Sequence, residues 1–252
     1  MASLHVNATQ AMIAAACEKA AKQGDLPYLK ALRKAECPWN EKTCENAAAG
    51  GHLELLKWAR TNGCPWDERT CSLAAAGGHL ELLKWARANG CPWDLWTCDQ
   101  AAGGGHLELL KWARLQDPPC PWNEWTCENA AANGHLELLQ WARANGCPWG
   151  PGTCSYAAGA GHLETLQWAR ANGCPWNAEV PKYAVMGGHL NVLQWACDPQ
   201  NGPCPIDKSA CDTAGEYGRY DALRYLHEIG APYTPLSFFS SDSESDSDKA
   251  AE

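Results

Sequence analysis

The sequence predicts an all-α repeat solenoid of eight stacked helix–turn–helix units, and three observations support this prediction. First, the segment GHLELLKWARTNGCPWDERTC, which begins at Gly51, returns from Gly78 onward as GHLELLKWARANGCPWDLWTC. Second, each repeat contains two short stretches of helical character separated by glycine. Third, neither stretch can bury its apolar side alone, so neighbouring repeats must stack to bury it together.

The register of the repeat follows from the residue after the glycine of each Gly-His pair. This position is occupied in turn by Asp25, His52, His79, His106, His135, His162, His189 and Arg219. Successive positions are evenly spaced, except where segments 115–119 and 197–203 lengthen a loop. Both insertions contain proline, as loops commonly do. We expect an N-terminal lead at 1–11, the solenoid at 12–234 and a disordered acidic tail at 235–252.

Each repeat starts with a short inner helix, as residues 67–78 illustrate. Asp67 is a good N-cap because its carboxylate can accept a hydrogen bond from a free backbone amide. The alanines that follow favour helix, and the paired glycines end it. An amphipathic outer helix is predicted next, over residues 80–88, and Gly90 is suited to its left-handed C-terminal cap.

The polar side of the outer helix is nearly constant. It consists of Glu54, Lys57 and Arg60 in one repeat, and the same residue types return in the next two copies. Opposite charges three residues apart stabilise a helix modestly. We interpret this side as solvated surface.

These residues resemble the ankyrin repeat. The match lies in the Ala-Ala-x-x-Gly-His-x-Glu core, seen here at residues 47–54, and in the Gly-Cys-Pro-Trp-Asp end, which takes the place of the family's Gly-Ala-Asp-Val-Asn. The period is about 27 residues, whereas the ankyrin repeat has roughly 33. The missing residues fall between Asp67 and Thr70, where the family has a projecting β-hairpin. The resemblance implies a shortened, finger-less ankyrin-type repeat that does not bind partners through hairpin tips.

Fifteen cysteines recur mainly at two places in the repeat, after threonine and at the start of Cys-Pro-Trp. The resemblance aligns them with buried aliphatic residues. Equivalent sulfurs should lie about 10 Å apart, too far for a disulfide, and the spacing of the two places fits no zinc ribbon or finger. We expect free thiols in the core of a protein kept in a reducing compartment. A metal- or redox-responsive protein that uses these cysteines is the alternative.

Twelve of the fourteen tryptophans also recur at two fixed places, and we interpret them as a structural ladder. The histidine of each Gly-His pair stands in a tight turn between helices. One histidine per repeat cannot supply the three or four converging ligands that a metal needs. We expect it to make a hydrogen bond within the turn or to the start of the outer helix.

Composition excludes several other functions. The net charge of −9 argues against nucleic-acid binding, and no run of about twenty apolar residues predicts a membrane span. No secretory signal is visible, so we expect a cytoplasmic or nuclear protein. No set of nucleophile, base and orienting residue stands out, and neither does a phosphate loop or a metal cluster. We therefore expect no enzyme activity, no cofactor, no metal and a monomer.

The candidate site is the part of the inner helix that varies between repeats. The varying positions are the residue before Thr-Cys and those four and seven residues further on, which form one stripe of a helix. In an ankyrin-type stack this stripe would line the concave surface. Trp96 and Trp125 are the two tryptophans outside the ladder, and interface hot spots favour Trp, Tyr and Arg. The predicted partner-binding residues are Lys42, Arg69, Leu73, Trp96, Gln100, Trp125, Asn129, Tyr156, Glu179 and Tyr183.

The predicted function is a non-enzymatic scaffold that binds another protein through this stripe. The basic residues Lys42 and Arg69 would steer an acidic end of the partner, and packing of the tryptophans on neighbouring repeats is the structural alternative. A ubiquitin-ligase substrate adaptor is a narrower alternative, although the short flanks show no recruiting box. In the acidic tail, Ser241, Ser243 and Ser245 each precede an acidic residue by three positions, as acidophilic kinases prefer, and Phe238-Phe239 resembles a short docking motif.

Overall fold

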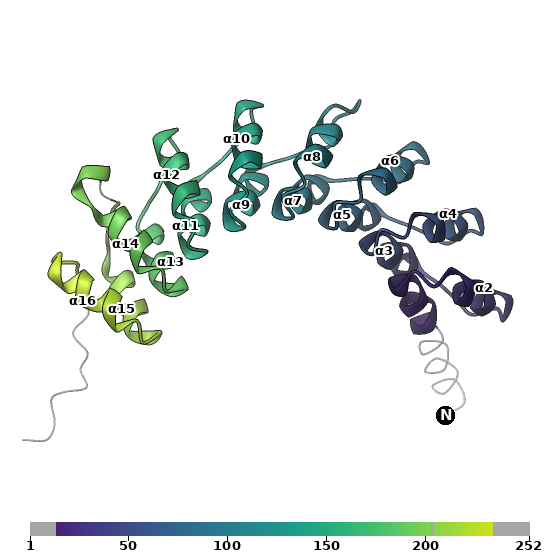
Figure 1. Ribbon diagram of the computed structural model, residues 1–252, viewed down its shortest axis with the longest axis horizontal. Coiled ribbons are helices and arrows are strands. Elements are labelled where there is room, and N and C mark those ends of the chain that lie inside the picture. Colours follow the sequence, from purple (N-terminus) through teal and green to yellow (C-terminus); the bar gives the residue numbers. More distant parts are fainter. Residues whose placement is uncertain (1–13, 203, 234–252) are drawn as a thin grey trace, which may run out of the picture.

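The computed structural model describes residues 14–202 and 204–233, and within these ranges the chain is helical and contains no strand. Pairs of antiparallel helices stand side by side and form an open arch (Figure 1). The predicted all-α solenoid of stacked helix–turn–helix units is therefore confirmed. The lead and the tail, including the three candidate serines and Phe238-Phe239, lie outside the described residues.

One helix of each pair lines the inside of the arch and the other faces outward (Figure 1). The inner helices are the helix described over 14–23, then α3 (Glu41–Ala49), α5 (Glu68–Ala76), α7 (Leu95–Gly103), α9 (Glu124–Ala132), α11 (Pro151–Gly159), α13 (Glu179–Gly187) and α15 (Lys208–Glu216). The outer helices are α2 (Leu26–Lys34), α4 (Leu53–Thr61), α6 (Leu80–Ala88), α8 (Leu107–Arg114), α10 (Leu136–Ala144), α12 (Leu163–Ala171), α14 (Leu190–Cys197) and α16 (Tyr220–Glu228). A short 3-10 turn, η1 (Pro199–Asn201), lies in the second lengthened loop.

The predicted helix ends are confirmed. Asp67 lies in extended backbone before α5, and its side chain accepts a hydrogen bond of 3.1 Å from the backbone amide of Arg69. After α6, Gly90 adopts the left-handed conformation with φ of +82°. Helix α11 starts differently, because Gly150 has no side chain to cap it and Pro151 takes the first helical position instead.

Side-chain size explains the curvature of the arch. The sides on which inner helices meet are built of small residues, such as Cys71, Ala74 and Ala75, all with no exposed surface, and successive inner helices pack directly on one another. Most outer helices contact chiefly their own inner partner, and tryptophans fill the wider space between them. Small residues on one side of the stack and large ones on the other bend it, which places the inner helices on the concave face.

The tryptophan ladder is present as six pairs of rings. Each pair joins the tryptophan of Cys-Pro-Trp to the tryptophan of the following outer helix, edge to face, with 5.7–6.0 Å between centroids. The interpretation of Arg60 as solvated surface was wrong. Its guanidinium carbon lies 4.0 Å from the ring centroid of Trp66, and it donates a hydrogen bond to the carbonyl of Cys64. Lys57, in contrast, pairs with Glu54 at 2.7 Å, as predicted.

The histidines connect one repeat to the preceding one. The sequence had led us to expect a hydrogen bond within the turn or to the start of the outer helix instead. Nε2 of His79 lies 3.1 Å from the carbonyl oxygen of Ala49, thirty residues earlier, and no side-chain capping bond is made at the helix start. The His79 ring packs against both Gly51 and Gly77. A Cβ added to either glycine would lie 2.6 Å or less from the nearest atom of that ring. The Gly-Gly-His sequence is therefore a joint between repeats.

The cysteines are free, and all except the half-buried Cys37 are buried, as predicted. The thiol of Cys91 donates to the carbonyl of Asp67, with 3.4 Å between sulfur and oxygen. It also forms a hydrogen bond with Cys71, and this bond together with burial raises the pKa of the Cys71 thiol. Burial alone raises the pKa of Cys197 to about 11. Such thiols remain protonated and react slowly.

Candidate functional site

The varying stripe lies along the inner helices on the concave side of the arch. Six of the ten predicted residues are exposed and four are half-buried. The exposed residues are Lys42 on α3, Arg69 on α5, Trp96 and Gln100 on α7, Trp125 on α9 and Glu179 on α13. The half-buried residues are Leu73 on α5, Asn129 on α9, Tyr156 on α11 and Tyr183 on α13.

Trp96 and Trp125 are large apolar side chains at equivalent places on neighbouring helices. Their exposed fractions are 52% and 49%. Each is the second residue of its helix, and its backbone amide donates a hydrogen bond of 3.0 Å to the N-cap side chain, Asp94 or Asn123. The caps therefore fix the backbone from which both indoles project.

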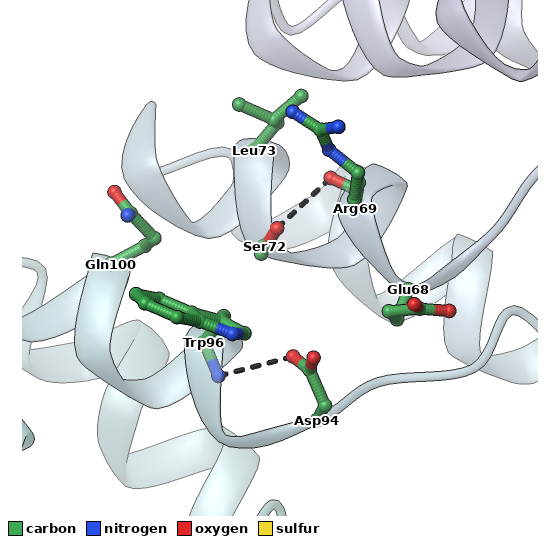
Figure 2. A pocket seen from close by; sticks show the side chains of 7 residues that line it. All are labelled: Glu68, Arg69, Ser72, Leu73, Asp94, Trp96 and Gln100. Atoms are coloured by element: carbon green, nitrogen blue, oxygen red, sulfur yellow. Dashed lines mark hydrogen bonds between the residues drawn. The ribbon is translucent and has the colours of Figure 1, made fainter.

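A pocket of about 400 Å³ opens between α5 and α7 beside Trp96 (Figure 2). Arg69 and Leu73 line it from α5, and Trp96 and Gln100 line it from α7. Ser72 also lines it and donates a hydrogen bond of 3.1 Å to the carbonyl of Arg69. Four predicted residues thus meet in one concavity that has apolar, amide and cationic groups.

A second, shallower concavity of about 300 Å³ lies further along the stripe. Tyr156 and Tyr183 line it, with their rings edge to face and 5.8 Å between centroids. Gly159 and Met186 are among its other lining residues. The central and C-terminal parts of the stripe therefore present an aromatic surface.

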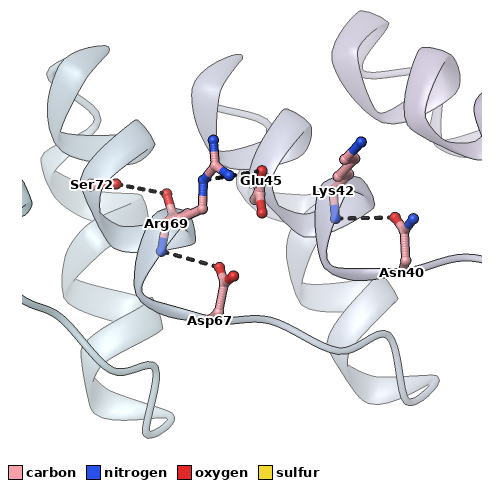
Figure 3. Close-up of polar contacts among 6 residues, drawn as sticks. All are labelled: Asn40, Lys42, Glu45, Asp67, Arg69 and Ser72. Carbon is pink, nitrogen blue, oxygen red and sulfur yellow. Dashed lines mark hydrogen bonds and ion pairs between the residues drawn. The ribbon is translucent and has the colours of Figure 1, made fainter.

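The basic end of the stripe is weaker than the sequence suggested. Nε of Arg69 lies 3.8 Å from Oε2 of Glu45 on the preceding inner helix (Figure 3). The guanidinium is two-thirds exposed, so the pair contributes little stability, but its charge is partly compensated. Lys42 is exposed at the N-terminal side of this pair.

The residue after Thr-Cys is a part of the site that the sequence interpretation missed. Glu45, Asp99 and Glu128 occupy this place in three repeats, and each faces the next inner helix. The side chain of Asp99 is only 1% exposed. One of its oxygens accepts a hydrogen bond of 2.6 Å from Thr126, and Oδ2 has no hydrogen-bond partner among the described residues. The sequence did contain a signal for this part of the site, because acidic residues recur at a helical position next to the buried alanines.

Burial changes the protonation of these carboxylates. Desolvation, assisted by the charge of Asp94, raises the pKa of Asp99 to about 6, against the opposing hydrogen bond from Thr126. Burial and the nearby charges of Glu124 and Asp99 also raise the pKa of Glu128. The floor of the stripe at α7 and α9 is therefore a region of uncompensated negative charge.

The described residues contain no group of three or more His, Cys, Asp or Glu side chains that could hold a metal ion. No helix within residues 14–202 and 204–233 has both the length and the apolar character needed to cross a membrane.

Comparison with known proteins supports the fold. No protein-family model matches the chain, and no curated protein is similar to it in sequence. Among solved structures, the ankyrin repeat domain of human ASB11 is similar, with a TM-score of 0.53 and 17% sequence identity. The similarity covers 76% of this chain and 99% of that one. At this identity the likeness concerns the fold, and the chain folds as an ankyrin-like repeat solenoid.

Proposed function

We propose that this chain is a protein-binding scaffold that holds its partner on the concave face, through the stripe of inner-helix residues. One observation carries the proposal. Twelve tryptophans pack in the ladder, whereas Trp96 and Trp125 project from equivalent places of adjacent helices with about half of their surface exposed. Exposed tryptophans beside a concavity are typical of interface anchors.

The form of the repeat supports the choice of this face. We propose that the units are ankyrin-type repeats shortened to about 27 residues, without the projecting hairpin. The step from Trp66 to Glu68, the first residue of α5, leaves no room for a hairpin. With no fingers at the edge of the stack, the broad concave surface is the remaining place where several repeats present varying side chains together.

The test uses the full chain and two variants of it as bait and compares which binding partners each one captures. Trp96→Ala combined with Trp125→Ala should lose a partner that the unchanged chain captures. Glu81→Ala combined with Glu108→Ala changes two exposed residues of the outer helices and should keep it. Capture from cell extract followed by mass spectrometry provides the readout. A partner retained by both variants would place the binding face elsewhere.

The alternatives receive less support. A redox or metal function would need accessible thiolates. Thiol–thiol hydrogen bonds and burial instead raise the pKa values of the cysteines after threonine, such as Cys71 and Cys98. A ubiquitin-ligase substrate adaptor is compatible with the proposed face. Nothing in the described residues favours it over other scaffolds.

A further inference from the structure

The place of Gly152 on α11 differs from its equivalents in the other repeats. Three other inner helices carry a side chain just before Thr-Cys; on α5 it pairs with Glu45 of the preceding helix, and on α7 it lines a pocket together with residues of α5. This residue is Arg69 on α5, Trp96 on α7 and Trp125 on α9. On α11 it is glycine, and the carboxylate of Glu128 occupies the place where a Cβ would stand.

The pair formed by Glu45 and Arg69 shows what chemistry this place accepts. Glu45 on α3 meets the guanidinium of Arg69 on α5 at 3.8 Å. Glu128 on α9 holds the same place as Glu45, one residue after Thr-Cys, and Gly152 holds the place of Arg69. The chain therefore has the acidic half of this pair at α9 but lacks the basic half at α11.

The inner helices α7, α9 and α11 supply no basic side chain to compensate this charge. The segments from Asp94 to Gly103, Asn123 to Ala132 and Gly150 to Gly159 contain four carboxylates and no lysine or arginine. These are the carboxylates of Asp94, Asp99, Glu124 and Glu128. Within the described residues, no ion pair joins any of them to a lysine or arginine.

Asp99 adds negative charge next to this place, and its charge contributes to the raised pKa of Glu128. Its side chain is almost fully buried between α7 and α9, and its Oδ2 has no hydrogen-bond partner among the described residues. Asp99 holds the place of Ser72, which lines the pocket beside Trp96 (Figure 2). A buried carboxylate without a counter-charge costs free energy, and a positive charge held nearby on the surface would lower that cost without touching Asp99.

The aromatic residues favour arginine over lysine as the source of that cation. Trp125 precedes Glu128 by three residues, so the two side chains share one side of α9. A planar guanidinium can pair with a carboxylate and also stack on an indole. The chain itself stacks guanidinium groups on indoles, since six arginines lie over ladder tryptophans at 4.0–4.4 Å.

We propose that the partner protein inserts an arginine beside Gly152, where its guanidinium pairs with Glu128 and Glu124 and is flanked by the exposed indole of Trp125. The inference rests on the function proposed above and names the chemistry of the partner: an arginine-bearing segment that lies along α7, α9 and α11. Lys42 and Arg69 alone had led us to expect an acidic segment of the partner. Such a segment would be repelled by the carboxylates at the centre of the stripe.

The experiment selects ligands without assuming their sequence. A random twelve-residue peptide library is panned on the full chain, and the enriched peptides are measured by fluorescence anisotropy. We expect enrichment of arginine, and a tenfold or greater loss of affinity in Glu128→Gln. The matched control is Glu137→Gln on outer helix α10, which should bind normally.

The outcomes separate this inference from the proposed function. Peptides that need Trp96 and Trp125 but lack arginine, carry lysine equally often, or ignore Glu128→Gln would overturn the inference and leave the proposed function intact. If no enriched peptide depends on the two tryptophans, or none is enriched, both ideas fail.

A second measurement needs no ligand. Gly152→Arg supplies the missing guanidinium, and only the end of the flexible Glu128 side chain has to move. Gly152→Arg should melt about 2–4 °C higher than Gly152→Gln, as expected for a pair contributing up to about 1 kcal/mol in a chain of this size. That difference should vanish in the Glu128→Gln background. Equal melting temperatures in the unchanged background would mean that the place does not favour a guanidinium.

Discussion

The guanidinium of Arg60 stacks on the indole of Trp66, with 4.0 Å between the guanidinium carbon and the ring centroid. The same guanidinium donates a hydrogen bond to the carbonyl of Cys64. Arg60 belongs to α4, and Trp66 contacts Trp85 of α6 edge to face. A side chain of one repeat thus links two outer helices that otherwise have few mutual contacts.

Removing one such arginine should loosen the stack. Arg87 lies 4.1 Å above Trp93 and donates to the carbonyl of Cys91. We expect Arg87→Ala to lower the free energy of unfolding by about 1–2 kcal/mol, from the lost cation–π contact and hydrogen bond. Lys84→Ala, which removes only a surface ion pair, should change it by less than about 0.5 kcal/mol. Urea denaturation followed by circular dichroism measures both, and equal losses would refute the structural role of the arginine.

Two glycines of similar backbone conformation should respond differently to alanine. Gly78 and Gly90 both have positive φ, +69° and +82°. A Cβ on Gly78 would lie 2.6 Å from the ring of His106, whereas a Cβ on Gly90 meets no atom within 4 Å. Both substitutions carry the backbone penalty of about 1–2 kcal/mol. We expect Gly78→Ala to lose at least about 1 kcal/mol more, because the joint between repeats must move. Similar thermal melting of the two variants would show that the histidine joint is pliable.

Native thiol chemistry should be confined to one residue. Cys37 is the cysteine that is not fully buried, while the remaining fourteen lie in the core. A thiol reagent should therefore modify Cys37 rapidly in folded protein and the others only after unfolding. Peptide mapping identifies the modified residue, and Cys37→Ser should abolish the fast phase. Rapid modification of several cysteines would instead favour the redox-responsive alternative.

Much of the fold could be predicted from sequence because the repeat presents the same local signals many times. Asp67 and Gly90 mark helix ends by properties of single residues, and the alternation of small and large side chains follows from periodicity. Contacts between repeats were harder to predict. His79 bonds to Ala49, and Arg60 reaches Trp66. Both arrangements depend on how adjacent repeats are oriented, and the sequence of a single repeat does not specify that orientation.

The exposure of the stripe could be predicted from the sequence, but its charge could not. The varying stripe identified Trp96 and Trp125, and both are exposed. The acidic floor was missed because Asp99 and Glu128 stand outside the stripe spacing, at a place that looks like core. The neighbouring inner helices bring no basic residue to these two carboxylates. This can be seen only when the helices are placed side by side in the structure.

Stability should fall as the pH rises through the titration of Asp99. The folded carboxyl keeps its proton up to a pKa of about 6, whereas the ordinary value is 3.8. Between these values the folded state binds more protons than the unfolded state, so the free energy of unfolding decreases with increasing pH. The full penalty, up to about 3 kcal/mol, is present above pH 6.

Asp99→Asn should remove that slope. The neighbouring acids Asp94 and Glu128 remain in the variant, so the informative quantity is the difference in unfolding free energy between variant and unchanged chain. We expect it to shift in favour of the variant between about pH 4 and pH 7, measured by urea denaturation at each pH. A difference independent of pH would mean that Asp99 titrates normally.

The two kinds of tryptophan should separate stability from binding. Trp96 and Trp125 each leave about half of their surface in solvent, so replacing either by alanine removes less buried area than replacing a ladder tryptophan and opens no cavity in the core; the melting temperature of the double variant should fall less than that of Trp112→Ala. Trp112 packs edge to face on Trp93 at 6.0 Å within the ladder, and Trp112→Ala should lower the free energy of unfolding by on the order of 3 kcal/mol. Binding should respond in the opposite way, with the double variant losing its partner and folded Trp112→Ala retaining it. Thermal melting and partner binding measured on the same preparations decide the matter, because a double variant that melts as early as Trp112→Ala would assign both indoles to the core.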